Sequence, residues 1–368
     1  MINENRRYEV ILPIFILILM FFGVLVLKSA VARMEGYESY PIKQIVWDGV
    51  AVFFLLLIIF LKKNLIRDFA IVLYVISIVL LIYVLVKAPV IGGSRRWISL
   101  KFLNFQPSEL TKLALIILLP LFFEKPSLRN FIFSIIITVL PVILIFLEPD
   151  LGTSILIAFI WFSIAIASKV KFRYVLTVIL IILIALPLFY IFGLKDYQKN
   201  RIEAFLNPQA HQSGAAYNVI RSKSAIASGG LLGRGYMKGP ANLFGFVPVD
   251  YSDFIVAVIG EEFGFLGIVF LISLYTAIMV RMYKMYEKVE DEYWKLIIIG
   301  VSTTFFFHIT ENMLMAIGAM PVTGIPLPFV SYGGSSTVIF GMMLGLVMKA
   351  YSITRIGKKV EPIVKRRT

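Results

Sequence analysis

Cysteine is absent from the 368-residue sequence, and histidine occurs only twice, at His211 and His308. Without cysteine there can be no disulfide, thiolate metal site or cysteine nucleophile, and two histidines exclude a histidine-rich metal centre. Charged residues are also scarce, at 16% of the chain against 59% hydrophobic residues, and the mean hydropathy is +0.89. Soluble domains carry about 25% charged residues. The composition therefore indicates a polytopic membrane protein.

Apolar runs recur along the whole chain, and a run of about 20 residues is long enough to cross the hydrocarbon core of a bilayer. Because backbone polar groups cannot stay unpaired in lipid, each span is expected to be a helix. The first run lacks a small-residue cleavage site and is interpreted as a retained span. The sequence predicts an all-α protein with about ten spans, near residues 9–31, 44–61, 68–87, 107–123, 130–147, 151–168, 174–193, 252–280, 295–319 and 333–352.

The cations of the short connections decide the orientation. If the N-terminus is cytoplasmic, the inner connections hold clusters such as Lys62, Lys63 and Arg67, and a basic tail near 353–368 also lies inside. Positive residues favour the cytoplasmic side, so both termini are expected there. The net charge of +14 follows mainly from these loops and the tail meeting anionic lipid. Because the cations are spread over both sides, the sequence does not favour nucleic acid binding.

A long polar stretch, about residues 194–251, is expected to form one outer loop between spans seven and eight, within a single membrane domain covering residues 1–368. It is longer than the ~12–15 residues usual for a structureless loop, and the pattern at 218–228 is helix-like. Its cations oppose the usual bias, so they either contact an anionic substrate headgroup or belong to a solvated loop. They are Lys195, Lys199, Arg201, Arg221, Lys223, Arg234 and Lys238.

Asp253 lies where this loop runs into the apolar stretch YSDFIVAVIGEEFG. A carboxylate at the edge of a membrane-embedded region is costly to keep, and an intramembrane ionisable residue is by default a candidate functional residue. We expect Asp253 at the mouth of a cavity that opens to the outer side.

The connection at 90–112, VIGGSRRWISLKFLNFQPSELTK, holds a second group of candidates. Arg96 can bind phosphate and Trp97 suits the headgroup level, which predicts an ordered interfacial turn. Glu109 and Lys112 are three residues apart on one helical face. They either neutralise each other within the membrane or line a substrate cavity.

Two further outer connections contain polar residues among Pro and Gly. The segment at 147–154, LEPDLGTS, has residues typical of a turn. The segment at 320–337, MPVTGIPLPFVSYGGSST, is apolar yet rich in Pro and Gly. The second predicts a re-entrant or cavity-capping segment, and its Ser331, Tyr332, Ser335 and Ser336 either bind a ligand or cap the last helix. His308 and Glu311 are interpreted as a satisfied interhelical pair.

Five strings carry a resemblance to a known family. In order and spacing they resemble the shape, elongation, division and sporulation (SEDS) family, more closely its elongation branch than its division branch. Two departures are PVDYSDF, where relatives more often carry Glu-x-His-Thr ahead of the Asp, and the pair Glu311-Asn312. The strings are RRWISLKFLNFQPSELTK, EPDLGTS, YQKNRIEAFLNPQAHQSGAAYNVIRSKSAIASGGLLGRG, YSDFIVAVIGEEFGFLG and GIPLPFVSYGGSS.

The resemblance implies a peptidoglycan glycosyltransferase that polymerises lipid II, an undecaprenyl-pyrophosphate-linked disaccharide pentapeptide, at the outer face of the bacterial cytoplasmic membrane. A hydroxyl nucleophile needs a general base, and Asp253 is the candidate. The leaving pyrophosphate needs cations, for which Arg96, Lys112 and Arg201 are the candidates, and Arg201 is expected near Asp253. A single carboxylate favours inversion. The substrate-contact set also includes Trp97, Glu109, Lys223, Ser331 and Ser335.

The resemblance also implies partners: lipid II and undecaprenyl pyrophosphate, a class B penicillin-binding protein with transpeptidase activity, and membrane proteins of the elongation complex. No metal-ligand spacing demands a cofactor, although a divalent cation, Mg²⁺ or Mn²⁺, on the pyrophosphate is compatible with the chemistry. Two alternatives stay open. One is a flippase or transporter of lipid-linked sugars, and the other is a scaffold that only recruits an enzyme.

Overall fold

The computed structural model describes residues 9–89, 95–100, 103–193, 198–199, 203, 205–207, 214–247 and 251–364. Within them each predicted span corresponds to a helix, which confirms the helical polytopic fold. The helices are α1 (Ile11–Ala30), α2 (Tyr40–Phe60), α3 (Lys63–Asp68), α4 (Ala70–Lys87), α5 (Pro107–Phe123), α6 (Leu128–Leu147), α7 (Leu151–Ala167), α8 (Phe172–Leu188), α10 (Ala215–Gly229), α11 (Pro240–Leu243), α12 (Ile255–Lys288), α13 (Glu292–Ala316) and α14 (Gly334–Val364).

In the described part of the chain, seven helical segments are long and apolar enough to cross a membrane, and α7 and α8 are shorter apolar helices. Peripheral helices expose large apolar side chains, among them Phe21, Phe60 and Ile184, as lipid-facing surfaces do. In contrast, α5 is almost wholly buried. It packs against α4, α6, α7, α13 and α14, so the polar residues of its first turns lie inside protein.

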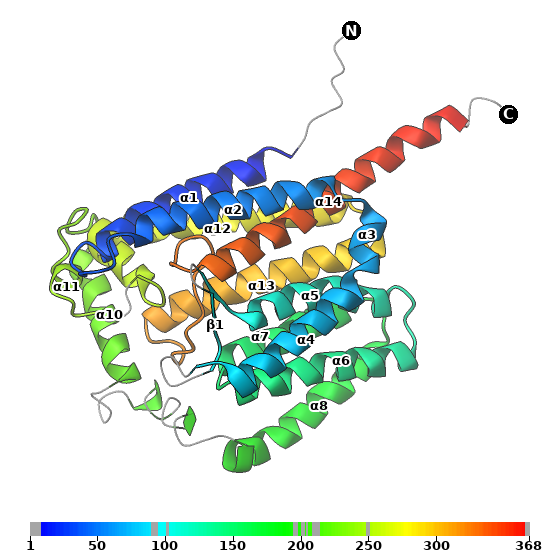
Figure 1. Cartoon of the computed structure of the whole chain (residues 1–368), viewed down its shortest axis with the longest axis horizontal. Helices are drawn as coiled ribbons and strands as arrows, with labels where there is room; N and C mark the ends of the chain where they lie inside the picture. Colours follow the sequence, from blue (N-terminus) through cyan, green and yellow to red (C-terminus); the bar gives the residue numbers. More distant parts are fainter. Residues whose placement is uncertain are drawn as a thin grey trace, which may run out of the picture.

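The helices form a bundle with two distinct ends (Figure 1). The start of α1 and the end of α14 lie at one end, and α10 and α11 lie at the other. This arrangement agrees with the prediction that both termini share one side, with the long loop on the opposite side. We call the end with α10 and α11 the outer end.

The all-α prediction missed a short hairpin at the outer end. Strands β1 (Ile98–Leu100) and β2 (Leu103–Phe105) are antiparallel, with Ile98 opposite Phe105. The Ser335 hydroxyl at the start of α14 donates to the Asn104 carbonyl over 2.8 Å, which ties the hairpin to the bundle. A second difference is at the end of α8, where a π-helical turn, η1 (Phe189–Gly193), replaces α-helix.

The outer loop is ordered where the structure describes it. Helix α10 covers the predicted helical pattern at 218–228, and it packs mainly on α12. The turn after α10 pairs with a break in α12 at Gly264, whose φ of +66° interrupts the helix. Backbone N–H groups of Arg234 and Gly235 donate to the Glu261 and Glu262 carbonyls, and Phe265 N–H donates to Gly230 O. The loop therefore supplies the hydrogen bonds that the break removes.

Candidate functional site

Asp253 lies in the turn that leads into α12, and its side chain is half-buried. The Ser252 hydroxyl donates to its carboxylate over 3.2 Å. Its backbone carbonyl accepts a 3.0 Å hydrogen bond from the Asn312 side chain of α13. Ser331 donates to the neighbouring Ser252 carbonyl over 2.6 Å. The position of Asp253 is thus fixed by α13 and by the connection between α13 and α14.

The connection between α13 and α14 approaches the Asp253 carboxylate closely at Gly324. A Cβ at Gly324 would lie 3.5 Å from Asp253 Oδ2, and its φ of +78° favours glycine. The Pro- and Gly-rich segment predicted to cap a cavity therefore borders Asp253 directly.

Glu109 and Lys112 form the buried pair that their spacing predicts. Lys112 Nζ donates to Glu109 Oε1 over 2.7 Å, and both side chains are almost fully buried. Lys112 has a second partner, because its Nζ lies 3.0 Å from His308 Nε2. His308 Nδ1 in turn lies 2.8 Å from the Pro326 carbonyl.

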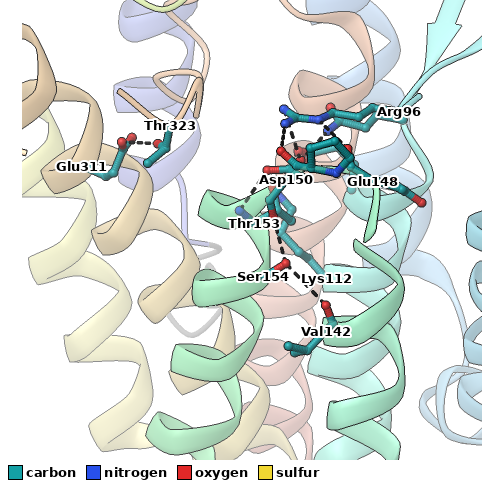
Figure 2. Close-up of polar contacts among 12 residues, drawn as sticks. Arg96, Lys112, Val142, Glu148, Asp150, Thr153, Ser154, Glu311 and Thr323 are labelled. Carbon is teal, nitrogen blue, oxygen red and sulfur yellow. Dashed lines mark hydrogen bonds and ion pairs between the residues drawn. The ribbon is translucent and has the colours of Figure 1, made fainter. Parts of the chain in front are cut away.

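The interpretation of His308 and Glu311 as partners of each other was therefore wrong. His308 faces Lys112. Glu311 instead accepts a hydrogen bond from Thr323 (Figure 2). His308 and Glu311 lie one turn apart on α13 but contact different segments. Their spacing in the sequence does not show which segment each side chain contacts.

Arg96 holds the turn between α6 and α7. Its Nε donates to the Glu148 carbonyl over 3.1 Å and its Nη2 to the Pro149 carbonyl, while Nη1 lies 3.9 Å from Asp150 (Figure 2). Asp150 also accepts from Gln106, just before α5, and from the Thr153 N–H at the start of α7. The two motifs that looked separate in the sequence, RRW and EPDLG, form one structural unit.

Glu148 is the unusual member of this unit. It is buried, and neither of its carboxylate oxygens has a hydrogen-bond partner among the residues that the structure describes. Burial, and then the charge of Asp150, raise the pKa of Glu148 to about 9, although Arg96 opposes the shift. The carboxyl is therefore protonated at neutral pH.

The remaining predicted site residues have separate surroundings. Ser331 accepts from the Leu327 N–H as well as donating to Ser252, and Ser335 bonds to Asn104, so both hydroxyls have protein partners. Trp97 is half-buried just before β1. Lys223 is exposed on α10 and approaches Gly318 at the end of α13. Arg201 lies outside the described residues, so its expected closeness to Asp253 stays a prediction.

Four tyrosines gather next to Asp253. The sequence singled out Tyr332 among them but did not indicate the cluster. Tyr40 and Tyr332 stack with centroids 4.1 Å apart, and Tyr37 and Tyr251 contact Tyr40 at 4.7 and 5.7 Å. Tyr251 precedes Asp253 by two residues and marks the departure noted in PVDYSDF. The rings come from three distant segments, so no local pattern indicates the cluster.

No group of three His, Asp or Glu side chains in the described part of the chain could hold a metal ion. The site instead combines cations with buried carboxyl groups near the outer ends of α5, α7 and α12. The divalent cation that the pyrophosphate could bring stays a prediction.

Fold and site together define a multi-pass membrane protein with charged and acidic groups buried near one membrane face. Residues 9–356 match the family model of FtsW, RodA and SpoVE, described as cell cycle proteins. The chain belongs to this family, which confirms the resemblance drawn from the motifs.

Relatives cover nearly the whole chain. The peptidoglycan glycosyltransferase MrdB of Escherichia coli (strain K12) is 31% identical over 341 residues, which are 92% of this chain and 91% of MrdB. RodA of Thermus thermophilus superposes with a TM-score of 0.70 at 28% identity, covering 95% of this chain and 98% of RodA. A chain from a peptidoglycan synthase complex that coordinates polymerization and crosslinking gives a TM-score of 0.83 at 28% identity, covering 95% and 99%.

Proposed function

We propose that this chain is a peptidoglycan glycosyltransferase that polymerises lipid II. The observation that carries the proposal is the family match over residues 9–356, joined by a glycosyltransferase relative aligned over 92% of the chain. The described parts of the RRW, EPDLG, YSDF and GIPLPFVSYGG motifs also lie at the outer end of the bundle. The elongation role, and with it rod shape, follows from the relatives named RodA and MrdB.

Asp253 is the proposed general base. The GlcNAc 4-hydroxyl of one lipid II attacks the anomeric carbon of the growing glycan, the bond from that carbon to the pyrophosphate oxygen breaks, and the hydroxyl proton passes to the Asp253 carboxylate. A positioned base contributes about 10²–10⁴-fold to such a step. Direct displacement inverts the anomeric centre, so an α-linked donor gives a β-linked glycan. The fixed backbone of Asp253 supports this role, because a base must be held in place.

Lys112 is the proposed cation for the leaving pyrophosphate. An ammonium has three N–H donors, and Glu109 and His308 account for two of them. The third is proposed to donate to an anionic oxygen as charge develops on it, and because Lys112 is 1% exposed in this structure, bound substrate has to open the site for that contact. Arg96 is bound to the turn between α6 and α7 and would act as a second positive group at the rim. Arg201, Lys223 and Trp97 complete the proposed contact set, and Ser331 and Ser335 support the backbone around it.

The proposed location is the cytoplasmic membrane, with the catalytic end facing outward. Undecaprenyl pyrophosphate is then released on the outer side, and a divalent cation, if required, arrives with the pyrophosphate. A class B penicillin-binding protein is the proposed partner, together with other membrane proteins of the elongation complex. A solved neighbour that belongs to a polymerising and crosslinking complex supports this assembly.

A flippase is the principal competing function. A transporter alternates access around groups near the bilayer midplane. Here Asp253, Glu109 and Lys112 all lie in or before the first two turns of α12 and α5, which favours chemistry at one face. Purified protein in lipid vesicles with lipid II decides between them: polymer supports the transferase, whereas translocation without polymer supports the flippase.

A further inference from the structure

His308 contacts the functional site but has no part in the reaction as proposed above. It is 1% exposed, lies in the outer half of α13, and has a different partner on each ring nitrogen. A buried ionisable residue inside a membrane bundle is costly, so a role that keeps it is expected.

The two contacts fix the tautomer of the ring. The Pro326 carbonyl can only accept, so Nδ1, 2.8 Å away, carries the hydrogen. Nε2 then presents a lone pair to the Lys112 ammonium at 3.0 Å. His308 is therefore a neutral acceptor for Lys112 and a donor to the connection between α13 and α14.

Asn312 lies one turn further along the same face of α13. It donates to the Ile325 carbonyl over 2.8 Å and to the Asp253 carbonyl over 3.0 Å. His308 and Asn312 thus bind two consecutive carbonyls of the connection, Pro326 and Ile325. The same two turns of α13 hold the Lys112 side chain on one side and the Asp253 backbone on the other.

A lysine side chain is flexible, and Glu109 alone would hold its ammonium only to its own helix. The contact from α13 adds a second fixed point from another element. Preorganised charge stabilises a transition state without further reorganisation, and a misplacement of about 1 Å can cost about 100-fold in rate.

We propose that His308 is a positioning residue for the glycosyl transfer, one that fixes the Lys112 ammonium relative to Asp253. The inference rests on the proposed function. It follows from a contact between α13 and α5, which the spacing of His308 within its own helix did not indicate.

The test compares substitutions of His308 that keep or lose both contacts. His308→Gln places an amide oxygen and an amide N–H where the two ring nitrogens lie, and His308→Met has similar length without polar atoms. Thr304→Val is the matched control, since Thr304 is buried one turn earlier on α13 and donates to Gly300 O of its own helix. Lipid II turnover and KM are measured on full-length protein in detergent, with thermal unfolding as the measure of folding.

The expected result is near wild-type turnover for His308→Gln and Thr304→Val. His308→Met should lose about 100-fold in kcat with little change in KM, because ground-state binding is retained. Equal turnover of folded His308→Met and wild type would overturn the proposal, as would a folded His308→Gln that is as slow as His308→Met. If His308→Met does not fold, His308→Asn takes its place: its amide is one methylene too short for both partners, and normal turnover would contradict the proposal.

A second readout does not depend on activity. If His308 holds Lys112, the loss of thermal stability from His308→Met should shrink in a Lys112→Met background, where the contact is already absent. Equal losses in both backgrounds would overturn the contact itself. Absence of polymer from wild-type protein would instead contradict the proposed function and leave this coupling measurable.

Discussion

At the scale of single residues, substitutions in the buried pair of Glu109 and Lys112 can test whether Lys112 has a structural or a catalytic role. Glu109→Gln alone leaves the ammonium with only His308, and breaking a buried pair costs about 3–5 kcal/mol. The double substitution Glu109→Gln with Lys112→Met should recover stability, measured by thermal unfolding, while glycan polymerisation stays low.

The opposite outcome for activity would assign the pair a different role. If the double variant polymerised lipid II at the wild-type rate, Lys112 would only neutralise Glu109, and the pyrophosphate would have to be bound by other cations.

Glu148 gives a pH prediction of definite sign. Its pKa is raised to about 9 in the folded protein by burial and Asp150, against an ordinary value of 4.5. The protonated carboxyl therefore contributes stability that is complete below about pH 4.5 and is lost as pH rises toward 9. We expect Glu148→Gln to flatten this part of the stability profile, measured as thermal midpoints at about pH 5, 7 and 9. Identical slopes for variant and wild type would show that Glu148 titrates normally.

At the scale of elements, the break in α12 depends on glycine. A Cβ at Gly264 would collide with the Gly233 backbone nitrogen, and the φ of +66° is unfavourable for other residues. Gly264→Ala should therefore destabilise the protein by about 2–4 kcal/mol, through strain and overpacking. Thermal unfolding in detergent measures the loss.

Gly49 provides the matched control for that substitution. It lies within α2, and a Cβ there meets no atom of the described residues within 4 Å. Gly49→Ala should be neutral or stabilising by up to about 1 kcal/mol, because alanine favours helix. If Gly264→Ala behaved like Gly49→Ala, the pairing of the outer loop with the helix break would not be a source of stability.

The elements differ in how far the sequence could predict them. Hydropathy located the spans because each helix satisfies its own backbone hydrogen bonds. The ion pair of Glu109 and Lys112 was predictable from helical spacing. The partner of His308 lies 196 positions away, and the break at Gly264 is satisfied by the turn after α10. Such contacts depend on which helices pack together, and no periodicity within one segment encodes that.

The candidate site follows the same rule. Asp253 stood out because an isolated carboxylate in an apolar context is costly, and the turn at 148–150 was recognisable by its residues. Three other features depend on contacts between distant segments. They are the hydrogen bonds from Arg96 to that turn, the tyrosine cluster, and the separate partners of His308 and Glu311. They became visible only once the bundle was assembled.

At the scale of the whole molecule, the arrangement predicts which residues face each side of the membrane. The chain has no native cysteine, so single cysteines can be introduced without background. In intact cells whose outer barrier admits the reagent, a membrane-impermeant maleimide should label Lys238→Cys, in the loop before α11. Lys63→Cys, at the start of α3, should react only after the membrane is opened. The reverse pattern would invert the topology and place Asp253 on the wrong side for the proposed reaction.

The most direct test of the account is polymerisation of lipid II by purified protein, comparing wild type with Asp253→Asn. Asparagine keeps the shape of the side chain and loses the proton acceptor, so thermal unfolding should be unchanged while glycan polymer falls by at least about 100-fold. The measurement is made with and without the proposed penicillin-binding partner, and wild type and variant are compared under the same condition. A well-folded Asp253→Asn protein that forms polymer at the wild-type rate would contradict the central claim that Asp253 is the base of a glycosyl transfer.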